Sequence, residues 1–242
     1  MNRDDGASRF FNPAPAISAV ALPGGNEAVV IDDVLLDPDG LVAWAREQAF
    51  QPATAFPYPG LIVSGPTGLS ERFADFFAQY ARTRLRARRT LAHDVRLSMV
   101  TTPPELLDPR QWQCHRDRVS DDSATLFVAS VLYLFRDPAL GGTSFYVPRQ
   151  SPGATDRITY DSLTLSPEAF TARYGLTAGY MDGSNAYFDC VARVPPAWNR
   201  MILYDAGFFH SGDIGRPDLL TSDPATGRLT LNCFFTCRRA AG

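Results

Sequence analysis

The second half of the chain most constrains the fold, because from Asp94 onward it contains short β-rich runs and no convincing long helix. Clusters of Pro, Gly and Asp separate these runs, in the way that turns separate strands. Five runs predict core strands: Val95–Thr101, Phe127–Phe135, Thr143–Val147, Arg200–Tyr204 and Leu229–Thr236. We therefore predict a mainly β protein with flanking helices around a double-sheet jelly-roll core.

The chain ahead of Asp94 predicts supporting elements. Ala28–Ile31 is typical of a short strand, and the residues from Asp37 to Gly40 form a start signal for a helix over Leu41–Phe50. Aromatic residues at helical spacing predict a second helix over about Ser70–Arg89, with its apolar face against a sheet. The arginines near its end lie mostly away from that face, so we expect them to be solvated.

A proline-rich stretch, Gln51–Gly65, separates the two helices and predicts an irregular loop. Its segment Phe56-Pro57-Tyr58-Pro59-Gly60 presents aromatic rings on an irregular backbone, where binding residues often lie. The same rings are also suited to covering the core. The sequence favours neither interpretation.

Composition excludes several classes of protein. A chain of 242 residues with 45% apolar content can bury a full core as one catalytic domain. All 23 basic residues are Arg, which excludes mechanisms that need a lysine as Schiff-base amine or phosphate hook. A net charge of -3 lacks the basic excess of a dedicated nucleic-acid binder.

The cysteines and the N-terminus indicate a cytoplasmic protein. The cysteines form no C-x-x-C pair, and we expect them to be reduced, buried thiols. The N-terminus carries Asp4 and Asp5 where a signal peptide would be basic, and Ala16–Leu22 is too short to cross a membrane. We expect residues 1–27 to form a tail or an arm, irregular or laid across the surface.

Two histidines and an aspartate form the candidate metal site. His115 and Asp117 lie two positions apart, so on an extended segment they point to the same face. His210 follows the predicted strand Arg200–Tyr204 and completes the set, although the Ser211-Gly212 sequence beside it also fits a surface turn. Two imidazoles and one carboxylate hold non-haem Fe(II) on one face and leave the opposite positions open. His93 has no carboxylate at the needed offset, and we expect it to be exposed or at a helix end.

The order of these segments resembles a known enzyme superfamily. Leu126–Phe135, the run Gly141-Gly142-Thr143-Ser144-Phe145-Tyr146, Arg200–Asp205 ahead of His210, and Gly227–Phe235 follow the His-x-Asp pair in turn. This order is similar to that of the Fe(II)/2-oxoglutarate-dependent oxygenases, most closely the prolyl-hydroxylase-like branch, over about Asp94 to Cys237. That superfamily shares its jelly-roll (double-stranded β-helix) architecture with the cupins.

The resemblance implies a function. His115, Asp117 and His210 would bind Fe(II), and 2-oxoglutarate would be the co-substrate, with ascorbate as a possible reductant. The reaction would hydroxylate a C–H bond of a peptide, an amino acid or a small natural product. Two departures narrow it: related halogenases have a small residue where Asp117 stands, and the nucleobase-demethylating branch has an Arg where Phe234 stands. Halogenation and nucleic-acid repair are therefore disfavoured.

The resemblance also indicates residues for the co-substrate. Arg228 would bind the far carboxylate of 2-oxoglutarate, because a guanidinium binds a carboxylate in bidentate fashion and keeps its charge. Thr230 would share its face of the strand and donate to the same carboxylate. Arg216 is a rival anchor that lies closer to His210 in sequence. Tyr133 matches a position that contacts this carboxylate in some related enzymes, or is simply a core tyrosine.

The predicted organisation has three regions. Residues 1–27 form the tail or arm, residues 28–93 an α/β support region packed on the core, and residues 94–239 the oxygenase core. Residues 148–199 exceed the short turn of the family, and we expect an insertion that forms a lid or substrate wall, a structural cover or an oligomer contact. Two other functions stay open: a jelly-roll metal- or ligand-binding protein without turnover, and a cupin-type dioxygenase that does not use 2-oxoglutarate. The substrate and the oligomeric state stay open as well.

Overall fold

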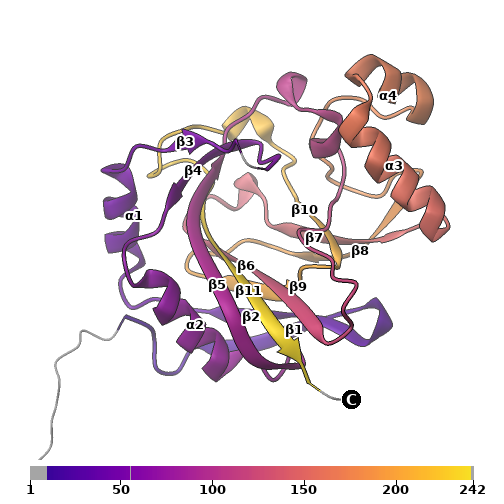
Figure 1. Ribbon diagram of the computed structural model, residues 1–242. Helices are drawn as coiled ribbons and strands as arrows, with labels where there is room; N and C mark the ends of the chain where they lie inside the picture. The colour runs from indigo at the N-terminus through magenta and orange to yellow at the C-terminus, as the bar shows by residue number, and fades with distance from the viewer. Residues whose placement is uncertain (1–9, 55, 241–242) are drawn as a thin grey trace, which may run out of the picture.

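The computed structural model describes residues 10–54 and 56–240 and contains two antiparallel β-sheets (Figure 1). The large sheet has, in spatial order, β1 (Ala16–Leu22), β2 (Asn26–Asp32), β9 (Met201–Asp205), β6 (Thr125–Tyr133), β11 (Leu229–Arg239), β5 (Ala87–Val100), β4 (Gly60–Ser64) and β3 (Gln51–Pro52). The small sheet has β10 (Phe209–Gly212), β7 (Thr143–Pro148) and β8 (Phe188–Val194). An isolated bridge pairs His115 with His210, so the segment at His115 extends the small sheet beyond β10. The mainly β jelly-roll fold predicted from the sequence is confirmed.

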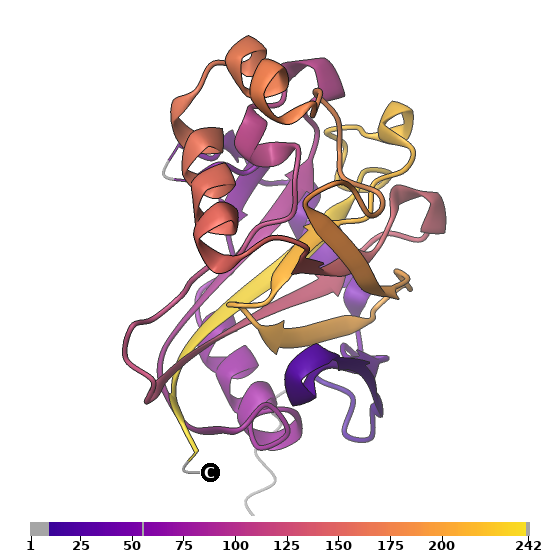
Figure 2. The ribbon, with the colours of Figure 1, turned by 90° about the vertical axis from the view of Figure 1, so that its right-hand side faces the viewer.

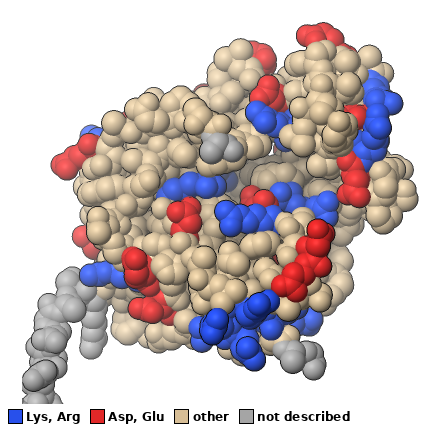
Figure 3. Space-filling view, viewed as in Figure 1, with Lys and Arg blue, Asp and Glu red and all other residues tan. Residues whose placement is uncertain are grey.

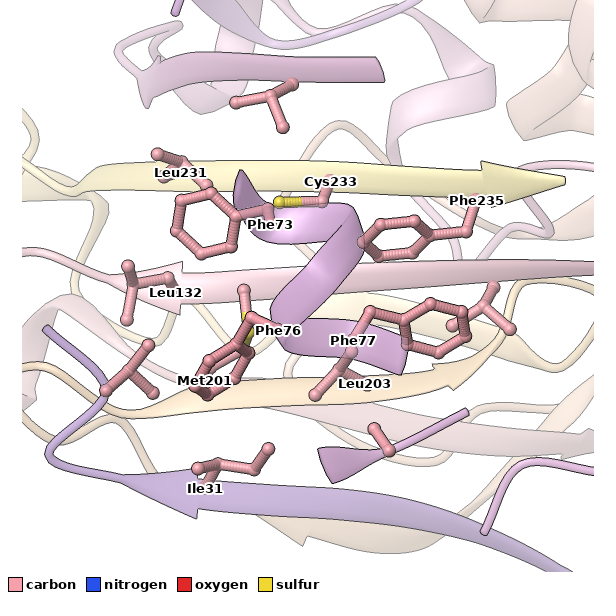
Figure 4. Packing of buried hydrophobic residues seen from close by; sticks show 14 of the residues in the cluster. Ile31, Phe73, Phe76, Phe77, Leu132, Met201, Leu203, Leu231, Cys233 and Phe235 are labelled. Atoms are coloured by element: carbon pink, nitrogen blue, oxygen red, sulfur yellow. The ribbon is translucent and has the colours of Figure 1, made fainter. Parts of the chain in front are cut away.

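Two helices cover the outer face of the large sheet. They are α1 (Pro38–Arg46) and α2 (Leu69–Tyr80). Figure 4 shows the rings of α2 lying over side chains of β11, β6 and β9. The ring of Phe77 stacks on that of Phe235, with centroids 4.3 Å apart. Burying a phenylalanine side chain of this kind stabilises the fold by about 1.5–3 kcal/mol.

The inner face of the same sheet is more polar. Side chains alternate along a strand, so the residues of β11 and β5 that flank the outward-facing core residues point inward. In the register of the sheet, Thr230 pairs with Ser98 and Asn232 pairs with Arg96. The amide of Asn232 donates to the hydroxyl of Ser98 over 2.9 Å. The large sheet thus presents apolar side chains to the helices and polar side chains to the interior of the jelly roll, and this polar interior suits a polar ligand.

Several boundaries differ from the sequence predictions. Part of the predicted tail forms β1, which pairs with β2 along its length, while residues 1–9 lie outside the described residues. The predicted loop Gln51–Gly65 contains β3 and β4. The predicted second helix ends at Tyr80 rather than Arg89, because the following residues turn and then enter β5. His93 therefore lies within a strand, where it pairs with Phe235 and its Nδ1 is 2.6 Å from the hydroxyl of Ser70.

The segment 148–199 contains two helices, α3 (Pro152–Thr164) and α4 (Pro167–Tyr174), followed by β8. Ser151 and Ser166 cap them, each side chain accepting a hydrogen bond from the backbone three residues on. Figures 1 and 2 place both helices at the opposite end of the molecule from α2. The assignment of this segment as an insertion stays a prediction.

Short 3-10 helices complete the elements, and each has a proline in its first turn, where the missing N–H needs no partner. They are η1 (Pro23–Gly25), η2 (Pro104–Leu106), η3 (Pro109–Gln111), η4 (Pro138–Leu140) and η5 (Pro217–Leu219). Within the described residues, every helix is too short or too polar to span a bilayer.

Candidate metal and co-substrate site

The structure brings together the three residues that the sequence singles out as metal ligands. One ligand atom from each of His115, Asp117 and His210 lies within 4.8 Å of the others. The Nε2 atom of His115 is 3.5 Å from Oδ1 of Asp117, and that of His210 is 3.3 Å from Oδ2. When two ligand atoms each lie about 2.0–2.2 Å from an ion and the angle between them at the ion is a right angle, the two ligand atoms are about 3 Å from each other. The donor set and its spacing therefore fit one divalent ion.

Backbone pairing fixes this arrangement. The N–H of His115 donates to the carbonyl of His210 over 2.9 Å, and the N–H of His210 donates back over 2.9 Å. Two positions on, the N–H of Asp117 donates to the carbonyl of Ala206 over 3.0 Å. The His-x-Asp segment is thus held against β10 and the turn before it. Residues far apart in sequence meet because the jelly roll makes their strands neighbours.

The surroundings of His210 determine which ring nitrogen is free. Its side chain is 6% exposed, and Nδ1 lies 2.9 Å from the carbonyl of Phe208. Since a carbonyl only accepts hydrogen bonds, Nδ1 carries the proton and Nε2 keeps its lone pair in the neutral ring. The ring of Tyr204 packs 4.7 Å away between centroids. His210 is therefore held in the tautomer that a metal ligand needs.

Charges at the site are coupled. Burial raises the pKa of Asp117, but the charge of His210 and hydrogen bonds from both histidines outweigh it and hold that pKa well below the ordinary 3.8. Burial lowers the pKa of His210, but the charge and the hydrogen bond of Asp117 outweigh it and raise that pKa above the ordinary 6.5. A metal ion would take the place of these protons, because ligation requires neutral imidazole and ionised carboxylate.

Arg228 is buried, with 5% of its surface exposed. Its Nε donates to the carbonyl of Leu140 over 2.9 Å and to that of Gly141 over 3.2 Å, and its Nη2 donates to the carbonyl of Gly142 over 2.8 Å. No carboxylate of the described residues forms an ion pair with it. Three neutral carbonyls orient this guanidinium and leave its positive charge unbalanced. A buried, uncompensated cation is suited to an anionic ligand.

The other predicted co-substrate residues lie beside Arg228. Thr230 and Tyr133 are partners in the register of β11 and β6. Both are buried, and the Tyr133 hydroxyl lies 2.9 Å from that of Thr143. Arg216, the rival anchor, lies instead on the surface in an ion pair with Asp218 at 2.6 Å. The geometry thus favours Arg228 over Arg216, while the roles of Arg228, Thr230 and Tyr133 stay predictions.

Two further residues enter this interior: Tyr58, from the Pro-rich segment expected either to bind a ligand or to cover the core, and Arg96, which the sequence analysis did not single out. Burial raises the pKa of Tyr58 to about 12, against the charge of Arg228 and hydrogen bonding with Ser98 and Thr230. Its hydroxyl therefore faces the predicted co-substrate residues. Arg96 enters from β5 and lies close enough to Asp117 and Tyr58 for both to affect its pKa. In the sequence, Arg96 and Ser98 alternate with the apolar residues Leu97 and Met99, and this pattern was the signal that both polar side chains lie on the opposite face of the strand from the apolar core.

The segment 148–199 reaches the ligand segment directly. Arg116, between the two ligands, lies 3.5 Å from Asp156 of α3. The N–H of Cys114 donates to the sulfur of Met181 over 3.2 Å. These contacts place the segment beside the proposed metal ligands.

Comparison with protein families identifies the chain. The model of a family described as "Family of unknown function (DUF6445)" matches residues 13–235. The chain belongs to DUF6445. None of the curated proteins matches this DUF6445 protein in sequence.

Solved structures share the fold of this DUF6445 protein. HygX from Streptomyces hygroscopicus with iron bound is 13% identical, with a TM-score of 0.50, over 86% of this chain and 81% of that one. HygX with nickel and 2-oxoglutarate bound is 14% identical, with a TM-score of 0.46, over 88% and 82%. A prolyl-4-hydroxylase from Pseudomonas putida is 17% identical, with a TM-score of 0.39, over 86% and 89%. At this identity, the likeness to HygX with iron bound, whose TM-score is 0.50, shows a shared fold alone.

Proposed function

We propose that the protein is an Fe(II)- and 2-oxoglutarate-dependent oxygenase that hydroxylates a C–H bond of a small molecule or peptide. The observation that carries this proposal is the cluster of His115, Asp117 and His210, whose ligand atoms lie within 4.8 Å of one another. The buried cation Arg228 supports it, because 2-oxoglutarate has a second carboxylate that needs a partner away from the metal. HygX, with the same fold, is described with iron bound.

Each residue has a defined task in this proposal. His115, Asp117 and His210 would hold Fe(II) on one face and leave the other face open. The carbonyl of Phe208 orients His210, and the pairing with β10 holds His115 and Asp117 in register. Arg228 would hold the far carboxylate of 2-oxoglutarate, with Thr230 beside it.

The overall reaction balances without a further reductant. When bound, Fe(II) supplies the chemistry that lets O₂ react with the keto acid and with the substrate. One oxygen atom enters the substrate C–H bond as a hydroxyl group, and the other enters succinate as 2-oxoglutarate loses CO₂. The protein's part is to orient both organic molecules and to exclude water. Ascorbate would only restore iron oxidised in unproductive turnover.

The test is succinate formation from 2-oxoglutarate by purified protein with Fe(II), ascorbate and O₂. We expect slow succinate formation without substrate and faster formation with a suitable one. Asp117→Ala should suppress both, because it removes a proposed ligand. His93→Ala is the matched control: this histidine lies on β5, contacts Ser70, and should be dispensable for turnover.

Other outcomes distinguish the alternatives. Protein that binds Fe(II) and 2-oxoglutarate but forms no succinate with any of a broad panel of peptides and amino acids would be a binding protein. Oxygen consumption that needs Fe(II) but not 2-oxoglutarate would indicate a cupin-type dioxygenase. Succinate formation that survives Asp117→Ala would contradict the proposed ligand set.

A further inference from the structure

The guanidinium of Arg96 packs against two aromatic rings in the interior of the jelly roll. Its Cζ atom is 4.1 Å from the centre of the Phe56 ring and 4.4 Å from the centre of the Phe234 ring. Cation–π contacts hold a guanidinium through its faces and leave its N–H groups, which point outward from the edges, for hydrogen bonds. The two rings therefore orient the donors of Arg96 without neutralising its charge.

These donors lack protein partners. The Nε–H of Arg96 is buried, and no hydrogen-bond acceptor for it is found within residues 10–54 and 56–240. No carboxylate in the same part of the chain forms an ion pair with Arg96. Other interior arginines donate hydrogen bonds to protein acceptors: Arg228 donates to three carbonyls, and Arg200 pairs with Asp32 at 2.6 Å. A buried donor without a partner is destabilising, so its presence in a native fold needs an explanation.

Arg96 lies at the metal end of the interior. Burial lowers its pKa most, while the charges of Asp94, Asp117 and Tyr58 act in the opposite direction. It is therefore a neighbour of the proposed ligand Asp117. Ser98, two residues along β5, is the register partner of Thr230 and belongs to the Arg228 end. The two cations thus occupy different parts of the interior.

In the proposed enzyme, the charge of Arg96 has no anionic partner of its own among the described residues. In the proposed enzyme, one carboxylate of 2-oxoglutarate binds the metal and the other binds Arg228, so neither is left over for Arg96. Asp94 and Arg118, which also affect the pKa of Arg96, are both exposed, so neither is a buried counter-ion or a buried second cation at this position. Figure 3 shows basic and acidic side chains together in a hollow near the middle of the face, beside the end that carries α3 and α4.

We propose that Arg96 binds a carboxylate of the primary substrate, so that the enzyme selects small carboxylic acids and holds them beside the metal. This inference rests on the proposed function and names its substrate class. Phe56 and Phe234 position the guanidinium for a bidentate contact.

The test measures binding separately from turnover. Protein loaded with Ni(II) and 2-oxoglutarate is titrated calorimetrically with free amino acids, hydroxy acids and N-acyl amino acids, each paired with its primary amide. The amide keeps the size of the acid and removes its charge. We expect acids that bind to do so at least about tenfold more tightly than their amides, the usual effect of a charged hydrogen-bonded pair.

Variants assign this preference to Arg96. Arg96→Met should abolish the preference for acids and leave the affinity for 2-oxoglutarate unchanged, while Arg96→Lys should restore part of the preference. Arg136→Met is the matched control, because Arg136 also packs on an aromatic ring, Trp198 at 3.9 Å, but pairs with Asp39 on the surface. It should leave the preference intact. Circular dichroism and melting curves establish that each variant is folded.

The outcomes separate this inference from the proposed function. Wild-type protein that binds acids and amides equally, or that binds no acid of the panel, overturns the assignment of Arg96 without using a variant. A tenfold loss of 2-oxoglutarate affinity in Arg96→Met would assign the residue to the co-substrate and also overturn it. Both results leave Fe(II)-dependent succinate formation in place. Failure of the proposed function would instead appear as absent succinate formation in wild-type protein.

Discussion

Replacing Arg228 by methionine should weaken both the fold and the co-substrate site. The side chain is buried, and its strongest contacts are hydrogen bonds of 2.9 Å and 2.8 Å to the carbonyls of Leu140 and Gly142. A hydrogen bond with a charged group contributes about 1.5–3 kcal/mol, so losing two costs about 3–6 kcal/mol. For a chain of this size that corresponds to a fall in Tm of about 6–24 °C.

The structure also predicts what Arg228→Met should spare. The carbonyls that Arg228 binds belong to the connection between β6 and β7, whereas His115 and His210 are held by their own backbone pairing. Metal affinity should therefore change little below the melting temperature, while 2-oxoglutarate affinity should fall at least about tenfold. Arg216→Met is the control, since its ion pair with Asp218 is exposed and should affect neither property.

Urea denaturation and calorimetric titration measure the two effects. Titration with Fe(II) and then 2-oxoglutarate, without O₂, at a temperature where the variant is fully folded, separates affinity from stability. An Arg228→Met protein as stable as wild type would refute the hydrogen-bond reasoning. Unchanged 2-oxoglutarate affinity in Arg228→Met, together with its loss in Arg216→Met, would show that Arg216 is the anchor.

Three further predictions concern the core, the co-substrate site and pH. Phe77→Ala should lower the free energy of unfolding by about 3–5 kcal/mol in urea titration, because the ring is fully buried and stacks on Phe235; a loss below 1 kcal/mol would contradict the packing described. Tyr58→Phe should weaken 2-oxoglutarate binding about 2- to 12-fold in calorimetry without changing metal affinity, and an unchanged affinity would remove Tyr58 from the site. In metal-free protein, the raised pKa of His210 stabilises the fold fully below pH 6.5, and this stabilisation is lost as the pH rises through the pKa of His210 in the folded state. The lowered pKa of Asp117 stabilises the fold fully above pH 3.8, and this stabilisation is lost as the pH falls through the pKa of Asp117 in the folded state. Thermal melts across pH should show that the Asp117→Ala protein loses less stability than wild type at both the high and the low end of the pH range. Identical pH profiles of Tm in the two proteins would contradict the coupling of His210 and Asp117.

The five core strands were predictable because apolar, aromatic and β-branched residues make up most of each run between clear turns. Other elements were not, because local patterns conflict with tertiary pairing. The start of β5 is rich in Arg, Ala and Leu, which favour helix, yet it pairs with β11 and forms a strand. β8, Phe188–Val194, has charged residues at Asp189 and Arg193 and exists as the edge partner of β7. Such strands are determined by their neighbours rather than by their own composition.

Proximity of the three candidate ligands was predictable for a physical reason. Two residues at i and i+2 of an extended segment share a face, and a jelly roll brings the end of a late strand beside it. The tautomer of His210 was not predictable, since it depends on the backbone carbonyl of Phe208. Arg96 was placed in a predicted strand, but its contact with Phe56 depends on how the Pro-rich loop folds back. Sequence alone does not fix that path.

The most direct test of the proposed metal site is a crystal structure of Fe(II)-loaded protein grown without O₂, with anomalous scattering recorded at the iron edge. We expect one iron bound by Nε2 of His115, Nε2 of His210 and a carboxylate oxygen of Asp117, each at about 2.0–2.2 Å. The remaining positions should face the interior that contains Arg228. An iron peak elsewhere, or one that His210 does not ligate, would contradict the proposed oxygenase site.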